Sequence, residues 1–242
     1  MTRHKPAVGT AGWSIPKQHA PAFPDTGTHL ERYARRLSAV EINSSFYRSH
    51  KRATYARWAA SVAPSFRFAV KVPKVVTHEH RLRDAEEPLG RFLAEVDALG
   101  DRLGPLLVQL PPSLRYDAAL SDGFFSRLRQ LFAGDVVCEP RHATWFTDSV
   151  EVRLSELRVA RVAADPAVVP RAAEPGGWRG LTYRRLHGSP EMYRSGYPIT
   201  VLDGWARQIR GEYRNGHASW CIFDNTALGE ATRNALDLLD RL

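Results

Sequence analysis

Eight short apolar runs, spaced along the whole chain, restrict the fold more than any other feature. They cover residues 7–13, 39–43, 66–73, 103–112, 136–139, 159–166, 181–188 and 218–225. Val136 to Cys138, for example, suit a strand that is buried in a parallel sheet. Segments with helical spacing of apolar side chains lie between most of these runs, at residues 30–37, 54–62, 89–99, 124–132, 150–157, 205–213 and 228–239.

This alternation predicts an α/β protein that forms a single (β/α)8 TIM barrel, as one domain over residues 1–242. No change of composition inside the chain marks a second domain. A doubly wound sheet is the alternative, but eight evenly spaced strands favour a closed barrel. We expect an irregular loop at residues 167–180, between strands six and seven, because Pro170, Pro175, Gly176 and Gly177 would break a helix there.

The run at residues 136–139 ends abruptly in polar residues. Glu139 is followed by Pro140, which limits the strand, and then by Arg141 and His142. In alternating α/β folds, ligands bind where strands end at their carboxyl side. The alternative is that Glu139 and Arg141 form a buried ion pair that only stabilises the loop.

The same pattern recurs at the other strand ends. The polar residues found there are Glu41, Asn43, Lys71, Gln109, Asp165, Arg185, His187, Asp224 and Asn225. We expect one pocket that contains Glu41, Gln109, Glu139 and His187, because burying so many polar groups has a desolvation cost that a structural protein would avoid. His187 alone would more often be a hydrogen-bonded core histidine, and Lys71 alone a counter-ion of a glutamate.

Aromatic residues directly follow several strands. Trp13, Phe46, Tyr47 and Trp145 are candidates for a rim that stacks on a sugar or a base, with loop packing as the alternative.

Charge and cysteine usage restrict the partners. Net charge is +8, which favours anionic partners, although many arginines lie on predicted helices and no run of basic residues resembles a basic tail. Cys138 and Cys221 lie in apolar runs and are expected to be buried thiols in a reducing compartment. Residues 1–7 carry basic groups with no apolar region behind them, and no stretch has the length of a membrane span, so we expect a cytoplasmic protein without a membrane partner.

The chain contains seven motifs in this order: GTAGW at residues 9–13, EINSSFY at 41–47, FAVKVP at 68–73 with Thr77-His78, GPLLVQLPP at 104–112, EPRHATW at 139–145, YRRLHG at 183–188 and FDN at 223–225. Together they resemble the YecE family, also called DUF72. The resemblance implies a TIM barrel. It implies no settled activity, because the family is described as of unknown function, with suggested similarity to endonuclease IV-like and sugar isomerase-like barrels. Asp224 and Ile15 depart from the family pattern, since an asparagine and an aromatic residue are common at these places.

The interleaving of carboxylates with cations favours an enzyme that acts on an anionic or sugar-like small molecule by acid–base chemistry. Glu139 and His187 are the acid–base candidates, with Glu41 and Lys71 as further catalytic candidates. The predicted substrate-binding residues are Trp13, Asn43, Tyr47, Gln109, Arg141, Trp145, Arg185, Asp224 and Asn225.

Two alternative functions remain open. A hydrolase or isomerase would hold a divalent metal on some of Glu41, Glu139, Asp165, His187 and Asp224. No His-x-His or His-Glu-x-x-His spacing is present, so we predict no metal and no cofactor. A non-catalytic nucleic-acid-binding protein is the other alternative.

An anion site is predicted at the last two strands. Lys71, Arg141 and Arg185 would face it, and Asn225 or Thr226 would cap the final helix, whose free N–H groups favour negative charge. The alternative is that both arginines are occupied by ion pairs with Glu139 and Asp224.

Overall fold

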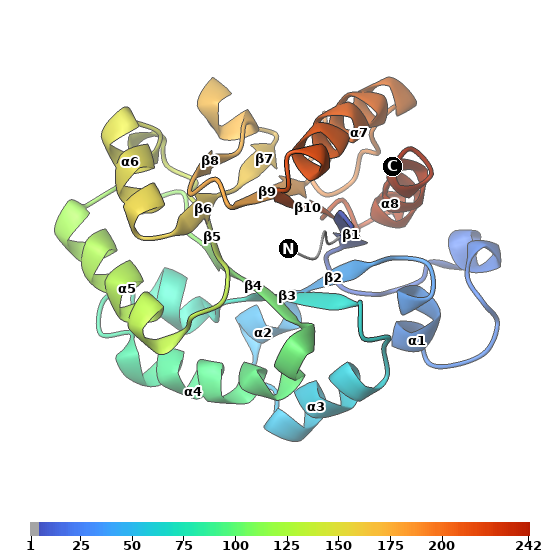
Figure 1. The fold of residues 1–242 in the computed structure, drawn as a ribbon, viewed down its shortest axis with the longest axis horizontal. Coiled ribbons are helices and arrows are strands. Elements are labelled where there is room, and N and C mark those ends of the chain that lie inside the picture. Colours follow the sequence, from blue (N-terminus) through green and yellow to red (C-terminus); the bar gives the residue numbers. More distant parts are fainter. Residues whose placement is uncertain (1–4) are drawn as a thin grey trace.

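Strands and helices alternate along residues 5–242, the part of the chain that this computed structural model describes (Figure 1). The strands are β1 (Ala7–Thr10), β2 (Ala39–Ile42), β3 (Arg67–Lys71), β4 (Leu103–Gln109), β5 (Val136–Glu139), β6 (Val159–Arg161), β7 (Ala163–Asp165), β8 (Gly176–Gly177), β9 (Leu181–Leu186) and β10 (Ala218–Phe223). The helices are α1 (His29–Ala34), α2 (Ser44–Tyr47), α3 (Arg52–Ala60), α4 (Glu86–Val96), α5 (Ala118–Leu131), α6 (Asp148–Glu156), α7 (Ile199–Arg214) and α8 (Glu230–Leu239). Each of the eight predicted strand regions contains a strand, and each of the seven predicted helical segments contains or overlaps a helix.

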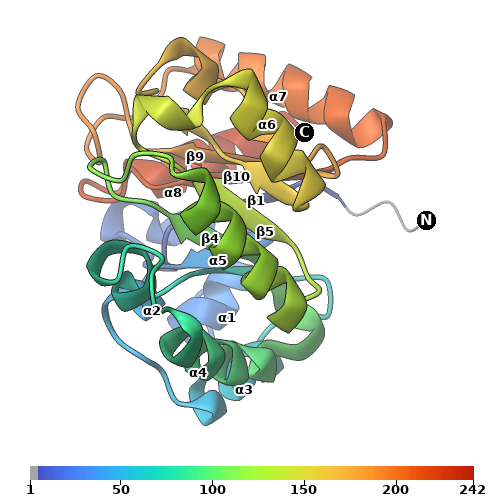
Figure 2. The same cartoon turned by 90° about the vertical axis from the view of Figure 1, so that its left-hand side faces the viewer.

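The helices lie outside a central group of strands. Figure 2 shows α4, α5, α6 and α7 following one another along the outside in chain order. Among residues 5–242, none of these helices combines the length and the apolar character that crossing a bilayer requires. Residues 1–4, which belong to the N-terminal stretch in which we expected no leader, lie outside the described residues.

The strands form two sheets, of order β2-β3-β4-β5-β6-β8 and β1-β10-β9-β7. All neighbouring strands are parallel except β6 and β8, which are antiparallel. The protein is therefore a mixed α/β fold with parallel sheets. The predicted barrel is not confirmed as one closed sheet.

The edges of the two sheets lie next to each other on both sides. Only Val162 separates β6 from β7, and its N–H donates to the carbonyl of Cys138 at 2.8 Å. On the other side, the N–H of Gly12 donates to the carbonyl of Glu41 at 2.9 Å. Gly9 permits this approach of β1 to β2, because a Cβ at residue 9 would lie 1.9 Å from the carbonyl oxygen of Ala39.

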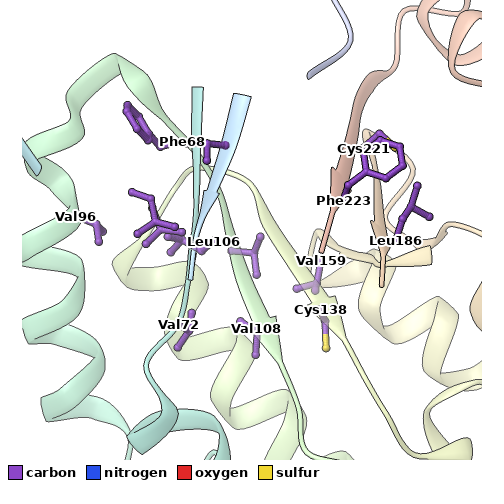
Figure 3. Packing of buried hydrophobic residues seen from close by; sticks show 14 of the residues in the cluster. Phe68, Val72, Val96, Leu106, Val108, Cys138, Val159, Leu186, Cys221 and Phe223 are labelled. Carbon is purple, nitrogen blue, oxygen red and sulfur yellow. The ribbon is translucent and has the colours of Figure 1, made fainter. Parts of the chain in front are cut away.

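Two apolar cores flank the strands. The larger one fills the space between the strands and the helices, and Figure 3 shows Phe68 and Leu106 from one sheet with Leu186 and Phe223 from the other. The smaller core contains inward side chains from both sheets. Its members include Ala7, Ala39, Ala69, Leu107, Val137, Ala160, Val162, Leu181, Tyr183, Trp220 and Ile222. The inner faces of the two sheets therefore share one core.

Residues 167–180 are irregular, as predicted, but they contain β8, which the sequence did not reveal. A short helix at Pro170–Ala173 precedes it. Glu151 of α6 accepts a hydrogen bond from the N–H of Gly177 and pairs with the buried guanidinium of Arg161. This side-chain pair supplies the contacts that regular strand pairing cannot supply to a two-residue strand.

Candidate functional site

Arg185 lies at the centre of the polar residues that end the strands. Its guanidinium donates to both carboxylate oxygens of Glu41 at 2.8 and 3.0 Å. It also donates to Glu139 at 2.5 Å and to Asp224 at 3.0 Å. Because Glu41 lies in β2, Glu139 ends β5 and Asp224 follows β10, one side chain joins residues of both sheets. We call Arg185 and these three carboxylates the Arg185 network.

His187 lies at the edge of the Arg185 network and has two possible hydrogen-bonding arrangements. Its Nδ1 lies 3.0 Å from Asp224 Oδ2, and its Nε2 lies 3.0 Å from both Glu139 Oε1 and Arg141 Nη2. With Nε2 unprotonated, Nδ1–H donates to Asp224 and Nε2 accepts from Arg141. With Nε2 protonated, it donates to Glu139 instead. The surroundings therefore accommodate the imidazole with or without its Nε2 proton.

Glu139 and Asp224 remain ionised despite their burial. Burial alone raises the pKa of Glu139, but Arg185 and Arg141 outweigh it and hold that pKa well below its ordinary value. Burial likewise raises the pKa of Asp224, and Arg185 together with the hydrogen bond from His187 lowers it below its ordinary value. The carboxylates are thus available to stabilise positive charge on His187.

Lys71 ends β3 and is the least compensated cation of the site. It is 8% exposed, and its Nζ lies 4.0 Å from the centroid of the Phe46 ring. No carboxylate of residues 5–242 forms an ion pair with it. Burial, and then repulsion from Arg185, lowers the pKa of Lys71 to about 8.

The groups of the site differ in what they present to solvent. The side chains of Glu41, Glu139 and His187 are at most 1% exposed, whereas Arg141 is 13% and Asp224 is 14% exposed. Tyr183 donates from its hydroxyl to Glu41 at 2.8 Å and closes the network on its inner side. A ligand would therefore meet Arg141, Asp224 and Lys71 first, with Glu41 beneath Arg185.

The structure brings together most of the predicted pocket. Glu41, Glu139 and His187 contact one network, and Gln109 lies beside Glu139 as its strand partner. The side-chain nitrogen of Gln109 makes only a long contact of 3.5 Å, to the carbonyl of Leu110. Asn43 follows β2, and its side-chain oxygen is buried without a hydrogen-bond partner. Tyr183 and Arg185 of β9 both contact Glu41, and His187 directly after β9 contacts Glu139.

Other predicted residues make structural contacts elsewhere. Trp145 is fully buried and donates from its indole to the carbonyl of Leu114 at 2.9 Å, so it does not form a stacking rim. Trp13 packs edge-on against Trp58 at 4.9 Å, and Tyr47 is 79% exposed. The carboxylate of Asp165 accepts a hydrogen bond at 2.7 Å from Tyr197 rather than from the network.

The predicted cap of the last helix is wrong. Helix α8 begins at Glu230, and its N-cap is Gly229, because residues 226–229 form a turn before the helix. The side chain of Asn225 is buried and donates to the carbonyl of Ser195 and to Asn234. Both arginines form ion pairs, as the alternative predicted: Arg185 with Glu139 and Asp224, and Arg141 with Glu139 at 2.6 Å. The anion site predicted at the last two strands therefore loses both Asn225 and Arg185.

Two residues near the site were not selected from the sequence. The ring of Tyr193 lies 5.7 Å from that of His187, and Tyr193 has a φ of +68° in the loop after β9. His78 packs edge-on against Phe46 at 4.9 Å. The Thr77-His78 pair belongs to a quoted motif and was a signal for His78, whereas no local pattern points to Tyr193.

The carboxylates of the site do not form a metal cage. Within residues 5–242, no group of three or more His, Cys, Asp and Glu side chains is arranged to hold a metal ion. The guanidinium of Arg185 lies where the oxygens of Glu41, Glu139 and Asp224 converge. Both cysteines are buried free thiols, as predicted, and both belong to the larger core.

A family model described as "Protein of unknown function DUF72" matches residues 7–242. The chain belongs to the DUF72 family. The family resemblance seen in the sequence is thereby confirmed, and the family description assigns no activity. A segment of 104 residues in this DUF72 chain is 33% identical in sequence to UPF0759 protein YecE of Escherichia coli K12. The aligned segment covers 43% of this chain and only 37% of that protein.

Solved DUF72 structures have the same fold. One from Thermotoga maritima is 22% identical, covers 98% of both chains and gives a TM-score of 0.79. One from Enterococcus faecalis is 19% identical, covers 98% of this chain and 94% of that one, and gives a TM-score of 0.80. At these identities the likeness shows a shared fold alone.

Proposed function

We propose that this DUF72 protein is an enzyme that transfers a proton to or from a small anionic or sugar-like molecule through His187. The observation that carries the proposal is the position of Nε2, 3.0 Å from both a guanidinium nitrogen and a carboxylate oxygen. Asp224 orients the ring through Nδ1, so that Nε2 is the atom that gains or loses the proton. Glu139 stabilises the protonated ring and stays ionised itself.

Access to Nε2 depends on Arg141. His187 is buried in this structure, and Arg141 lies between it and solvent with a partly exposed side chain. An anionic ligand would attract the guanidinium and draw its nitrogen away from Nε2. Binding of the correct substrate would then expose the reactive atom, which couples recognition to catalysis.

The proposed site lies at one end of a barrel. We infer that the two sheets together form a distorted (β/α)8 barrel in a single domain, because β6 continues directly into β7, β1 contacts β2, and both sheets share the smaller core. The site then occupies the carboxyl ends of the strands, where barrel enzymes bind their substrates. The buried free thiols support a reducing, cytoplasmic location.

The two alternative functions have less support. A metal-dependent hydrolase or isomerase would need the carboxylate oxygens that Arg185 occupies. A nucleic-acid-binding protein would use positive charge spread along a track, whereas Lys71 and Arg141 are largely buried at the strand ends.

Turnover of a defined set of compounds tests the proposal. Purified protein would be incubated with a mixture of phosphorylated sugars and sugar acids, and substrate loss followed by mass spectrometry and NMR. We expect His187→Gln to reduce turnover by about 100-fold or more, the usual scale of general acid–base catalysis. His29→Gln, at an exposed histidine on α1, is the matched control and should retain full activity.

Three results would contradict the proposal. Full turnover by His187→Gln would show that the histidine is structural. Activity that appears only with added divalent metal would favour the metal-dependent alternative. Binding of duplex or single-stranded nucleic acid without turnover of any small molecule would favour the third function.

A further inference from the structure

We propose that His78, Lys71, Arg81 and Arg141 form a subsite for a dianionic phosphoryl group, on the β3 and β4 side of the strand ends. The proposal rests on the proposed function and specifies the anionic end of its substrate. The anionic end of the substrate would then lie away from α8, beside which the sequence had predicted the anion site. The contacts of the segment after β3 support this position of the subsite.

Residues 74–84 form a strained segment after β3. A short π-helical turn, Val75–Glu79, begins it, and Arg81, Leu82 and Asp84 then have positive φ values of 54°, 69° and 42°. Non-glycine residues in this region cost free energy, and such strain clusters at functional sites. π-Helical turns are likewise frequent at functional sites. We call residues 74–84 the β3 strap.

The β3 strap holds Arg81 in one place. The two terminal nitrogens of its guanidinium donate to the hydroxyl and the carbonyl of Ser113, at 2.9 and 3.0 Å. Leu82 beside it is buried in the larger core. Ser113 lies in the loop after β4, so the arginine bridges two neighbouring strand ends. The strain of the strap therefore yields a fixed cation beside the site.

His78 is oriented by its neighbours. Its Nδ1 lies 2.9 Å from the hydroxyl of Thr77, and its ring packs edge-on against Phe46. Phe46 also carries the ammonium of Lys71 against its ring. Within residues 5–242, Nε2 of His78 has no hydrogen-bond partner, so it can bind a ligand.

The charged groups that shift the pKa of His78 are all cations. The pKa of His78 lies below its ordinary value, mainly because the side chain is partly buried. Repulsion from Lys71, Lys74, Arg141 and Arg81 lowers this pKa further. The carboxylates nearby are occupied, since Glu79 pairs with Lys74 at 3.4 Å, and Glu139 and Asp224 contact arginines and His187. Asp84, at the end of the β3 strap, is exposed and forms no recorded ion pair.

A phosphoryl dianion suits this arrangement better than a single carboxylate. Within the described residues, Lys71 and Arg81 form no ion pair with a carboxylate, and Arg141 shares Glu139 with Arg185. A dianion would balance more than one of these three positive charges. Binding would also favour protonation of His78, which could then donate from Nε2. Attraction of Arg141 toward the subsite would release His187 Nε2, so phosphoryl binding and proton transfer would be linked.

Binding of inorganic phosphate tests the subsite without any turnover. NMR would follow the ring protons of His78 during phosphate titration, with sodium chloride keeping the ionic strength constant. We expect phosphate to raise the pKa of His78. His78→Asn and Arg81→Ala should each weaken phosphate binding by about tenfold or more, the scale of a lost charged hydrogen bond.

Arg83→Ala is the matched control, because Arg83 lies on the same strap and its side chain is exposed. It should change phosphate affinity less than about twofold, the small effect that screening allows for an exposed charge. Lys71→Met provides a second variant outside the strap, in case Arg81→Ala disturbs the loop. It should also weaken phosphate binding.

The outcomes separate this proposal from the proposed function. Phosphate binding that Arg83→Ala weakens as much as Arg81→Ala, or an unchanged His78 signal in the unaltered protein, would overturn the subsite. Phosphate binding as expected, with full turnover by His187→Gln, would leave the subsite standing and refute the acid–base role of His187.

Discussion

At the residue scale, Lys71 has an environment that disfavours its charge. The ammonium is almost buried, its nearest recorded contact is an aromatic ring, and Arg185 repels it. A buried lysine without a partner reduces the stability of the folded state. Such residues persist where activity needs them, at the expense of stability.

Replacing Lys71 by Met should therefore stabilise the protein at pH 7. The pKa of Lys71 is about 8 in the folded protein, against 10.5 for an ordinary lysine. The unfolded chain then binds the proton more tightly, so stability rises with pH between these values and the penalty is fully present below pH 8. We expect Lys71→Met to raise the free energy of unfolding at pH 7 by up to about 3 kcal/mol.

Urea denaturation at pH 7 and at pH 9.5 measures this effect. The advantage of Lys71→Met should shrink at the higher pH. Lys74→Met, at an exposed lysine paired with Glu79, is the control and should change stability by less than about 1 kcal/mol at both pH values. A destabilised Lys71→Met at pH 7 would show that Phe46 and the surrounding carboxylates compensate the charge.

At the element scale, the contact between β1 and β2 sets the distance between the two sheets on one side. The strands approach so closely at Gly9 that a Cβ would meet the backbone of Ala39. The hydroxyl of Tyr33 on α1 accepts from the N–H of Thr10 at 2.8 Å and donates to the carbonyl of Ala39 at 3.1 Å. A helix side chain thereby replaces part of the hydrogen bonding that a regular strand pair would have.

Gly9→Ala should destabilise the protein by about 3 kcal/mol or more, because backbone cannot move aside as a side chain can. Gly123→Ala is the matched control, since Gly123 lies exposed within α5 and a Cβ there meets no atom within 4 Å. It should stabilise the protein by about 0.5 to 1 kcal/mol through helix propensity. Thermal and urea denaturation measure both changes, and equal stabilities of the two variants would refute the close approach.

At the scale of the whole molecule, the Arg185 network joins the two sheets above their shared core. Arg185 belongs to β9 in one sheet, whereas Glu41 and Glu139 belong to the other. Arg185 is the main cause that lowers the pKa values of Glu139 and Asp224, and it donates two hydrogen bonds to the buried carboxylate of Glu41. The charges therefore stabilise the arrangement of the sheets only as a complete set.

Arg185→Met should destabilise the protein by about 3 to 5 kcal/mol at pH 7, because it leaves buried carboxylates without their partner. The loss should decrease as the pH falls, since protonated carboxylates need no counter-ion. Arg91→Met, at an exposed pair with Glu87 on α4, should cost less than about 1 kcal/mol. Urea denaturation from pH 7 to pH 5 measures both, and a pH-independent loss would assign the effect to packing.

The sequence by itself determined where most of the strands and helices lie, that polar groups gather at the strand ends, and which family the chain resembles. These are local properties, because hydrophobic spacing, proline stops and alternation along a strand depend on neighbouring residues. Arg185 and His187, both selected from the end of one strand region, contact the same carboxylate of Asp224 in the structure.

Only the tertiary structure decided which of these polar groups meet. Asp224 and Asn225 are adjacent in the sequence, yet one contacts Arg185 and the other is buried against Asn234. Arg185 likewise pairs with three carboxylates that lie 39, 46 and 144 residues away in the sequence. Beyond the end of a strand, the path of the chain and the direction of each side chain follow from packing and long-range electrostatics, which no local pattern encodes.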